Sequence, residues 1–92
     1  MFVVINGEPI MQQAFILINA EPGKLWKIAD SANKVKGVKM ANAVTGAFDV
    51  IVYAEVVDMN DLGSLINAIQ TIDGVTRTQT AICMKHPAWQ SG

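Results

Sequence analysis

Apolar runs and segments with helical periodicity alternate along the chain. The first long run, AFILINA at residues 14–20, is continuously apolar and is followed by the turn sequence EPG, so it predicts a buried strand. A helix is then expected to begin at Pro22, which suits a first helical turn, and apolar residues recur at helical spacing up to Val35. Gly37 follows the last of them and predicts the end of this helix.

The middle of the chain predicts two strands joined by a short turn. Residues 38–44 predict the first of these strands. Residues 48–57, FDVIVYAEVV, predict the longest strand of the chain, which we expect at the centre of the sheet. Between them the sequence TGA, residues 45–47, predicts a hairpin turn in which glycine supplies a positive φ angle.

The last part of the chain predicts a second helix and a final strand. Asp58 is a favourable N-cap residue, and apolar side chains then recur on one helical face from Met59 to Ile72. Residues 75–84 predict the last strand. Residues 85–92, KHPAWQSG, are expected to form a tail.

The order of these elements is βαββαβ, and the segments VKGVKMANAV and IDGVTRTQTA weakly repeat one another. The sequence therefore predicts an α+β, ferredoxin-like plait over residues 14–84, an antiparallel sheet with both helices on one face. Residues 1–13 are an N-terminal extension outside this plait. Its opening MFVVI could form an extra edge strand, or Met11 could be the start of translation, and the sequence leaves both alternatives open.

Both faces of the predicted inner strands are apolar. Ile16 and Ile18 lie on one side of the first strand, and Phe15 and Leu17 on the other, while strand 48–57 shows the same two-sided pattern. Two helices cover only one face, so a monomer would expose a wide apolar patch. A chain with 51% hydrophobic and 16% charged residues fits the same interpretation. We therefore expect a dimer formed by packing sheet against sheet.

Composition and charge bear on which classes of function are expected and on the cellular compartment of the protein. A net charge of −1 and a pI of about 5.6 provide no electrostatic footprint for nucleic acid, so direct binding to DNA is not expected. The single cysteine excludes an internal disulfide. No signal peptide, membrane span, metal-ligand spacing or cofactor motif is found, and we expect a cytoplasmic protein without a membrane partner or a cofactor.

The turn before the longest strand carries the clearest candidate chemistry. In a polar pocket at a subunit boundary, backbone N–H groups at Thr45 and Gly46 could bind a carboxylate. Asp49 or backbone carbonyls could bind an ammonium group, and a small amino acid offers both groups. Thr78 and Thr80 alternate along the last strand and direct their hydroxyls to one face. Two plainer interpretations remain open: Asp49 could bond amides of its own turn, and alternating threonines are common on exposed strands.

At these residues the sequence resembles a known family. The segments AFILINAEPGK, KGVKMANAVTGAFDVIVYAEVVDMNDL and IDGVTRTQTAI are similar to the C-terminal effector domain, or RAM domain, of the Lrp/AsnC (feast/famine) transcriptional regulators. The resemblance covers residues 14–84. Its most specific part is a strand, then threonine, glycine, any residue, an aromatic residue and aspartate, then a strand.

The resemblance implies a ferredoxin-like domain that dimerises through its sheets and assembles further into octameric or decameric rings. It also implies that amino acids or related effectors bind at contacts between dimers. The turn glycine of the family matches Gly46, its aromatic position is Phe48, and its acidic position is Asp49. Strand positions near the effector match Thr78 and Thr80 less securely.

One departure from the family bears on function. Full regulators carry a helix-turn-helix before the effector domain, and residues 1–13 are too few to form one. We therefore expect a stand-alone, non-enzymatic effector domain that does not bind DNA itself and that could co-assemble with full-length regulators.

Two other classes of protein share the predicted fold. Dimeric α/β-barrel enzymes, such as small monooxygenases and isomerases, place polar or aromatic residues in a cavity between sheet and helices, where Tyr53 and Trp26 could serve. No acid–base pair accompanies them, and the only histidine, His86, lies in the tail. An ACT-like amino-acid sensor is the other alternative, with Gly23 alone as weak support.

Overall fold

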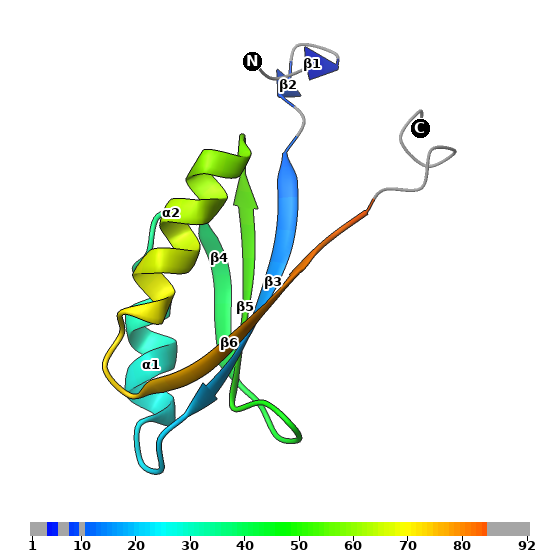
Figure 1. Ribbon diagram of the computed structural model, residues 1–92. Helices are drawn as coiled ribbons and strands as arrows, with labels where there is room; N and C mark the ends of the chain where they lie inside the picture. The colour runs from blue at the N-terminus through cyan, green and yellow to red at the C-terminus, as the bar shows by residue number, and fades with distance from the viewer. Residues whose placement is uncertain (1–3, 6–7, 10, 85–92) are drawn as a thin grey trace.

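The computed structural model describes residues 4–5, 8–9 and 11–84. Helices and strands follow one another as expected from the periodicity (Figure 1). In chain order the elements are β1 Val4–Ile5, β2 Glu8–Pro9, β3 Gln12–Ala20, α1 Leu25–Ala32, β4 Val38–Ala43, β5 Val50–Val56, α2 Met59–Gln70 and β6 Val75–Ile82.

Four of these strands form one antiparallel sheet in the order β4-β5-β3-β6, and both helices lie on the same face of it (Figure 1). The predicted α+β, ferredoxin-like plait is therefore confirmed. The expected central strand β5 shares the middle of the sheet with β3. Ile18 of β3 pairs with Val50 of β5 on one side and with Thr78 of β6 on the other.

Alternation along the inner strands places the core between the sheet and the helices. The buried side chains of β3 and β5 all point toward the helices, because successive residues of a strand face opposite sides. Leu62, Leu65 and Ile69 complete this core from α2, and Ile28, Ala29 and Ala32 complete it from α1.

Several predicted boundaries were wrong. The first helix begins at Leu25 instead of Pro22, because Pro22 belongs to a turn closed by the Lys24 amide bonding the Glu21 carbonyl at 3.1 Å. It ends at Ala32, so Val35 lies in the connection that follows.

Two strands also begin at residues other than those predicted. β5 starts at Val50, since Phe48 and Asp49 belong to the loop before it. β3 starts earlier than expected, at Gln12, which pairs with Val56 at the far end of β5.

The segment before the plait contains a separate two-stranded sheet. Val4–Ile5 pairs with Glu8–Pro9 in antiparallel fashion, and neither strand belongs to the four-stranded sheet. The tail at residues 85–92, including His86, lies outside the described residues. Within the part of the chain that the structure describes, no helix is long and apolar enough to cross a membrane.

Candidate functional site

The loop between β4 and β5, residues 44–49, contains four of the six candidate site residues. It projects beyond the end of the sheet (Figure 1). The Val44 amide donates to the Asp49 carbonyl at 2.9 Å, which closes the base of the loop. Thr45 and Gly46 are exposed, and Gly46 has a φ of +113°, the left-handed region that glycine tolerates best.

Asp49 joins this loop to the neighbouring strand. Its Oδ2 accepts a hydrogen bond from the Ala20 amide at 2.7 Å, and its own amide donates to the Ile18 carbonyl at 2.8 Å. The contact lies where the pairing of β3 with β6 shifts register, between Asn19 and Ala20. An acidic residue at the entry of β5 is therefore explained by a partner on β3, and not by the amides of its own turn.

Asn19 is a second anchor of the loop that sequence reasoning missed. Its Nδ2 donates to the Ala47 carbonyl at 2.9 Å, so the loop is fastened to β3 by two side chains. Asn19 lies within an apolar run of the sequence. The only signal for its role would have been a polar residue at that position. Phe48, between the two contact points, is half-buried.

Thr78 and Thr80 do not join the loop within one chain. They are the register partners of Ile18 and Ile16, so they lie across β3 from β5, on the side of the sheet that faces the helices. Thr78 Oγ1 accepts a hydrogen bond from Gln70 Nε2 of α2 at 3.0 Å. The structure thus gathers Thr45, Gly46, Phe48 and Asp49 together and leaves the two threonines apart from them.

The face of the sheet away from the helices, here called the open face, carries an apolar patch. Its apolar and aromatic side chains come from all four strands: Phe15, Leu17, Met40, Ile51, Tyr53 and Ala81. The rings of Phe15 and Tyr53 lie 5.2 Å apart between centroids, and Phe15 is still 37% exposed. Apolar patches of this kind are typical of interaction surfaces.

A row of hydrogen-bonded polar side chains borders the open face. Gln13 Nε2 donates to the Tyr53 hydroxyl, which donates to Glu55 Oε2, both at 2.8 Å. Burial, together with the bond to Glu55, raises the pKa of Tyr53. The phenol is therefore held as a neutral donor near pH 7, the opposite of an activated base.

Trp26, the other residue considered for an enzyme, is 71% exposed on α1, and neither Trp26 nor Tyr53 is among the described residues that line the cleft beside α2. Among the described residues, no group of three or more His, Cys, Asp or Glu side chains could hold a metal ion.

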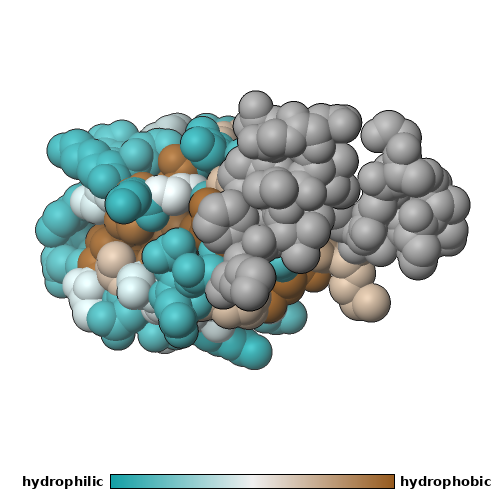
Figure 2. All heavy atoms as spheres, turned by 90° about the horizontal axis from the view of Figure 1, so that it is seen from above, coloured by the Kyte–Doolittle hydropathy of each residue, from teal (hydrophilic) through white to brown (hydrophobic). Residues whose placement is uncertain are grey.

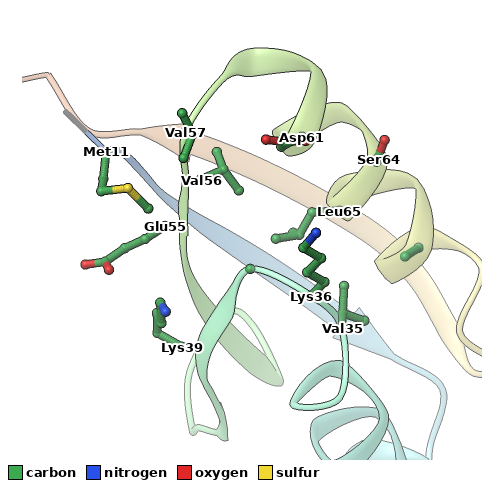
Figure 3. A pocket seen from close by; sticks show the side chains of 12 residues that line it. Met11, Val35, Lys36, Lys39, Glu55, Val56, Val57, Asp61, Ser64 and Leu65 are labelled. Atoms are coloured by element: carbon green, nitrogen blue, oxygen red, sulfur yellow. The ribbon is translucent and has the colours of Figure 1, made fainter. Parts of the chain in front are cut away.

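A cleft of about 630 Å³ opens between α2 and the start of β4, and sequence reasoning missed it (Figure 3). Its floor is apolar and includes Val56 and Leu65, while Lys36 and Asp61 stand on its walls. Figure 2 looks down on the molecule from above and shows apolar side chains as a brown band between polar ones. The cleft and the 44–49 loop lie at opposite ends of β4.

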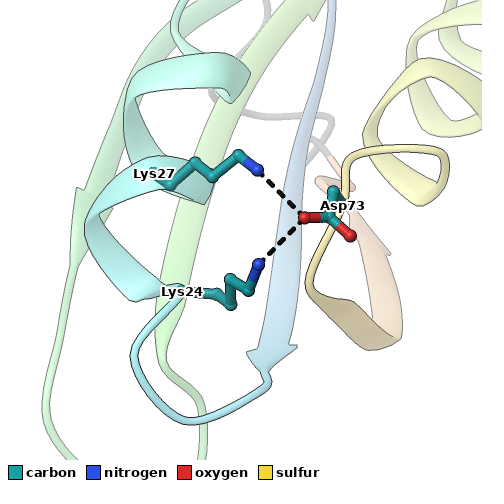
Figure 4. Close-up of polar contacts among 3 residues, drawn as sticks. All are labelled: Lys24, Lys27 and Asp73. Carbon is teal, nitrogen blue, oxygen red and sulfur yellow. Dashed lines mark hydrogen bonds and ion pairs between the residues drawn. The ribbon is translucent and has the colours of Figure 1, made fainter.

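The two halves of the plait are tied together at one corner (Figure 4). Lys24 and Lys27 of the first half both contact Asp73 Oδ2, at 3.0 and 2.9 Å. Hydrogen bonds from Lys27 and Lys24 lower the pKa of Asp73, and the bond to Asp73 raises the pKa of Lys24. This corner is a structural fastening between α1 and the turn before β6.

Comparison with known proteins decides the family. Residues 13–89 match the Lrp/AsnC ligand binding domain. The chain belongs to this family. The Lrp/AsnC resemblance seen in the sequence is thereby confirmed.

Relatives of this Lrp/AsnC domain are regulators of transcription. An uncharacterized HTH-type transcriptional regulator of Pyrococcus abyssi is 34% identical over 77 residues, which cover 83% of this chain and 49% of the regulator. The chain spans about half the length of the curated relatives it matches.

Solved structures similar to this chain have the same fold. FFRP-DM1 is 30% identical with a TM-score of 0.74, and the match covers 79% of this chain and 99% of that one. The transcriptional regulator NMB0573 of Neisseria meningitidis, solved as a complex with L-Met, is 25% identical with a TM-score of 0.71; the match covers 83% of this chain and 51% of that one.

Proposed function

We propose that this Lrp/AsnC domain is an amino-acid-responsive assembly module. In this proposal an amino acid, or a related small effector, binds at the 44–49 loop where two subunits meet. Backbone N–H groups near Thr45 and Gly46 bind its carboxylate, Asp49 contributes its second carboxylate oxygen to the ammonium group, and Phe48 contacts the side chain. Thr78 and Thr80 would enter such a site from another subunit, since within one chain β3 separates them from the loop.

The observation that carries this proposal is the rigid mounting of an exposed glycine loop. Two side-chain bonds, from Asn19 to Ala47 and from Ala20 to Asp49, hold a loop whose tip is otherwise open to solvent. A preorganised loop binds a small ligand with less loss of conformational entropy than a mobile one. The L-Met complex of the NMB0573 relative supports amino acids as the ligand class.

Assembly is the second part of the proposal. The open face packs against the open face of a second copy, and such dimers join into a ring of eight or ten subunits, as the resemblance implies. FFRP-DM1 is matched over 99% of its chain, so a crystallised chain of this extent has the same fold. Co-assembly with full-length Lrp/AsnC regulators would let the module act on transcription while making no DNA contact itself. The chain's net charge of −1 is consistent with that role.

Isothermal titration with each common amino acid tests the ligand site. Gly46→Ala should weaken binding of the effector at least tenfold, because a Cβ at positive φ reshapes the loop that carries the N–H groups. Gly23→Ala is the matched control: Gly23 also has a positive φ, +83°, and like Gly46 has no atom within 4 Å of an added Cβ. Equal affinity in both variants would contradict the site.

A further inference from the structure

The cleft beside α2 is distinct from the proposed effector loop. It is formed where β5 continues past the first residue of β4, so that Val56 and Val57 face the connection 35–37 and the first turns of α2. Its volume of about 630 Å³ lies within the range of ligand-binding clefts.

Gly37 creates the depth of this cleft. With a φ of +94°, it turns the chain from α1 into β4. A Cβ added there would lie 2.9 Å from Leu65 Cδ1, so one of the two atoms would have to shift, and 3.2 Å from Val56 Cγ1, which is a tight contact. The floor below it is apolar and closely packed, since Val56 and Leu65 are only 6% and 2% exposed. The absence of a side chain at residue 37 therefore keeps an apolar floor open at its edge.

Opposite charges stand on the two walls of the cleft. Figure 3 shows the Lys36 amine turned into it from the β4 side and the Asp61 carboxylate turned into it from α2. Within residues 11–84, the structure gives neither group an ion pair; its salt bridges join Lys24 and Lys27 to Asp73. The Ser64 hydroxyl is on the same wall as Asp61.

A second pair of opposite charges lies at the outer rim of the cleft. Lys39 and Glu55 also line the cleft, but the Glu55 carboxylate already accepts the Tyr53 hydroxyl at 2.8 Å. Among the described residues, the side chains of the inner pair, Lys36 and Asp61, have no ion pair or hydrogen bond, so both could bind a ligand.

We propose that this cleft binds a short zwitterionic peptide with apolar side chains. Lys36 holds the terminal carboxylate, Asp61 with Ser64 holds the terminal ammonium group, and the side chains lie on the floor formed by Val56 and Leu65. A simple fatty acid would leave Asp61 facing a hydrocarbon chain, whereas a peptide satisfies both walls. This site is independent of the effector loop, so either can fail without the other.

The test uses the full 92-residue chain and the dipeptide leucylvaline. Its addition at millimolar concentration should shift the backbone amide resonances of Lys36, Gly37, Asp61 and Leu65 and leave those of residues 44–49 in place. N-acetyl-leucylvaline amide has the same side chains without either charge, and it should bind about tenfold more weakly. No shifts, shifts confined to the 44–49 loop, or equal binding of the capped peptide would overturn the proposal.

Variants of exposed residues separate the site from general effects on folding. Lys36→Met should weaken binding of leucylvaline about tenfold, while Lys34→Met, two positions earlier and outside the cleft, should leave it unchanged. Ser64→Phe fills the cleft from an exposed position on its wall and should abolish binding without loss of the folded spectrum. Equal affinities of the Lys36 and Lys34 variants, or full binding by the Ser64 variant, would overturn the assignment.

Discussion

The carboxylate of Asp49 accepts the Ala20 amide at 2.7 Å, which joins the start of β5 to the end of β3 across 29 positions of sequence. Asp49→Ala removes this acceptor and leaves a partly buried N–H group without a partner. We expect the free energy of unfolding to fall by about 1–2 kcal/mol. Asp49→Asn keeps an acceptor oxygen and should lose less.

Urea denaturation of the two variants measures this difference. Asp30→Ala is the control, because Asp30 is exposed on α1 and has no hydrogen bond assigned to its side chain among the described residues. If Asp49→Ala were as stable as Asp30→Ala, the anchoring role of Asp49 would be wrong. Because we propose that Asp49 also binds the effector, an effect of its substitution on ligand binding must be corrected for the change in stability.

Asn33 closes the outer edge of β4. Its side chain accepts from the Ala41 amide at 3.1 Å and donates to the Ala41 carbonyl at 2.9 Å, so it takes the place of a neighbouring strand. Asn33→Ala should lower the free energy of unfolding by about 1–3 kcal/mol and expose an edge that can pair with other chains.

Hydrogen exchange followed by NMR measures directly how well the amides at this edge are protected. The Ala41 amide should exchange faster in Asn33→Ala, while Asn67→Ala, at an exposed position of α2, should leave it unchanged. Unaltered protection of Ala41 in the Asn33 variant would refute the edge-closing role.

The open face should be where copies of the chain dimerise. Phe15→Asp places a charge at the centre of that face and should convert the protein to a monomer at micromolar concentration, because an unpaired charge would be buried in the contact. Trp26→Asp is the matched control, since Trp26 is an even more exposed aromatic residue on α1. Light scattering coupled to size exclusion gives both masses; a Phe15 variant with undiminished mass would exclude this interface.

The Asp73 corner predicts a pH dependence at the acid end. Its pKa is lowered in the folded protein by Lys27 and Lys24, so the unfolded chain binds the proton more readily. The contribution of the ionised Asp73 to the free energy of unfolding is present above the ordinary carboxyl pKa of 3.8. It is lost as the pH falls through the lowered pKa of the folded protein. Asp73→Asn should therefore show a smaller loss of stability on acidification than the parent, measured by urea midpoints over that range. Parallel pH profiles would contradict the coupling.

The order of elements could be predicted because apolar periodicity encodes it. The side of β3 and β5 that meets the helices could not, since both faces of these strands are apolar. The side to which Thr78 and Thr80 point could not, since VTRTQTAI has too little apolar alternation to fix its orientation. The Asp49–Ala20 bond joins residues far apart in sequence, so it exists only once β3 and β5 are in register. The cleft likewise depends on how Gly37 meets Leu65 and Val56, which local patterns do not contain.

Native mass spectrometry of the purified protein, with and without a pool of the twenty amino acids, tests the central claim most directly. We predict an even-numbered assembly, built from dimers, that carries amino-acid adducts whose mass names the effector, and loss of the adduct in Gly46→Ala but not in Gly23→Ala. A bare dimer or monomer that takes up no amino acid would contradict the account of an effector-binding assembly module.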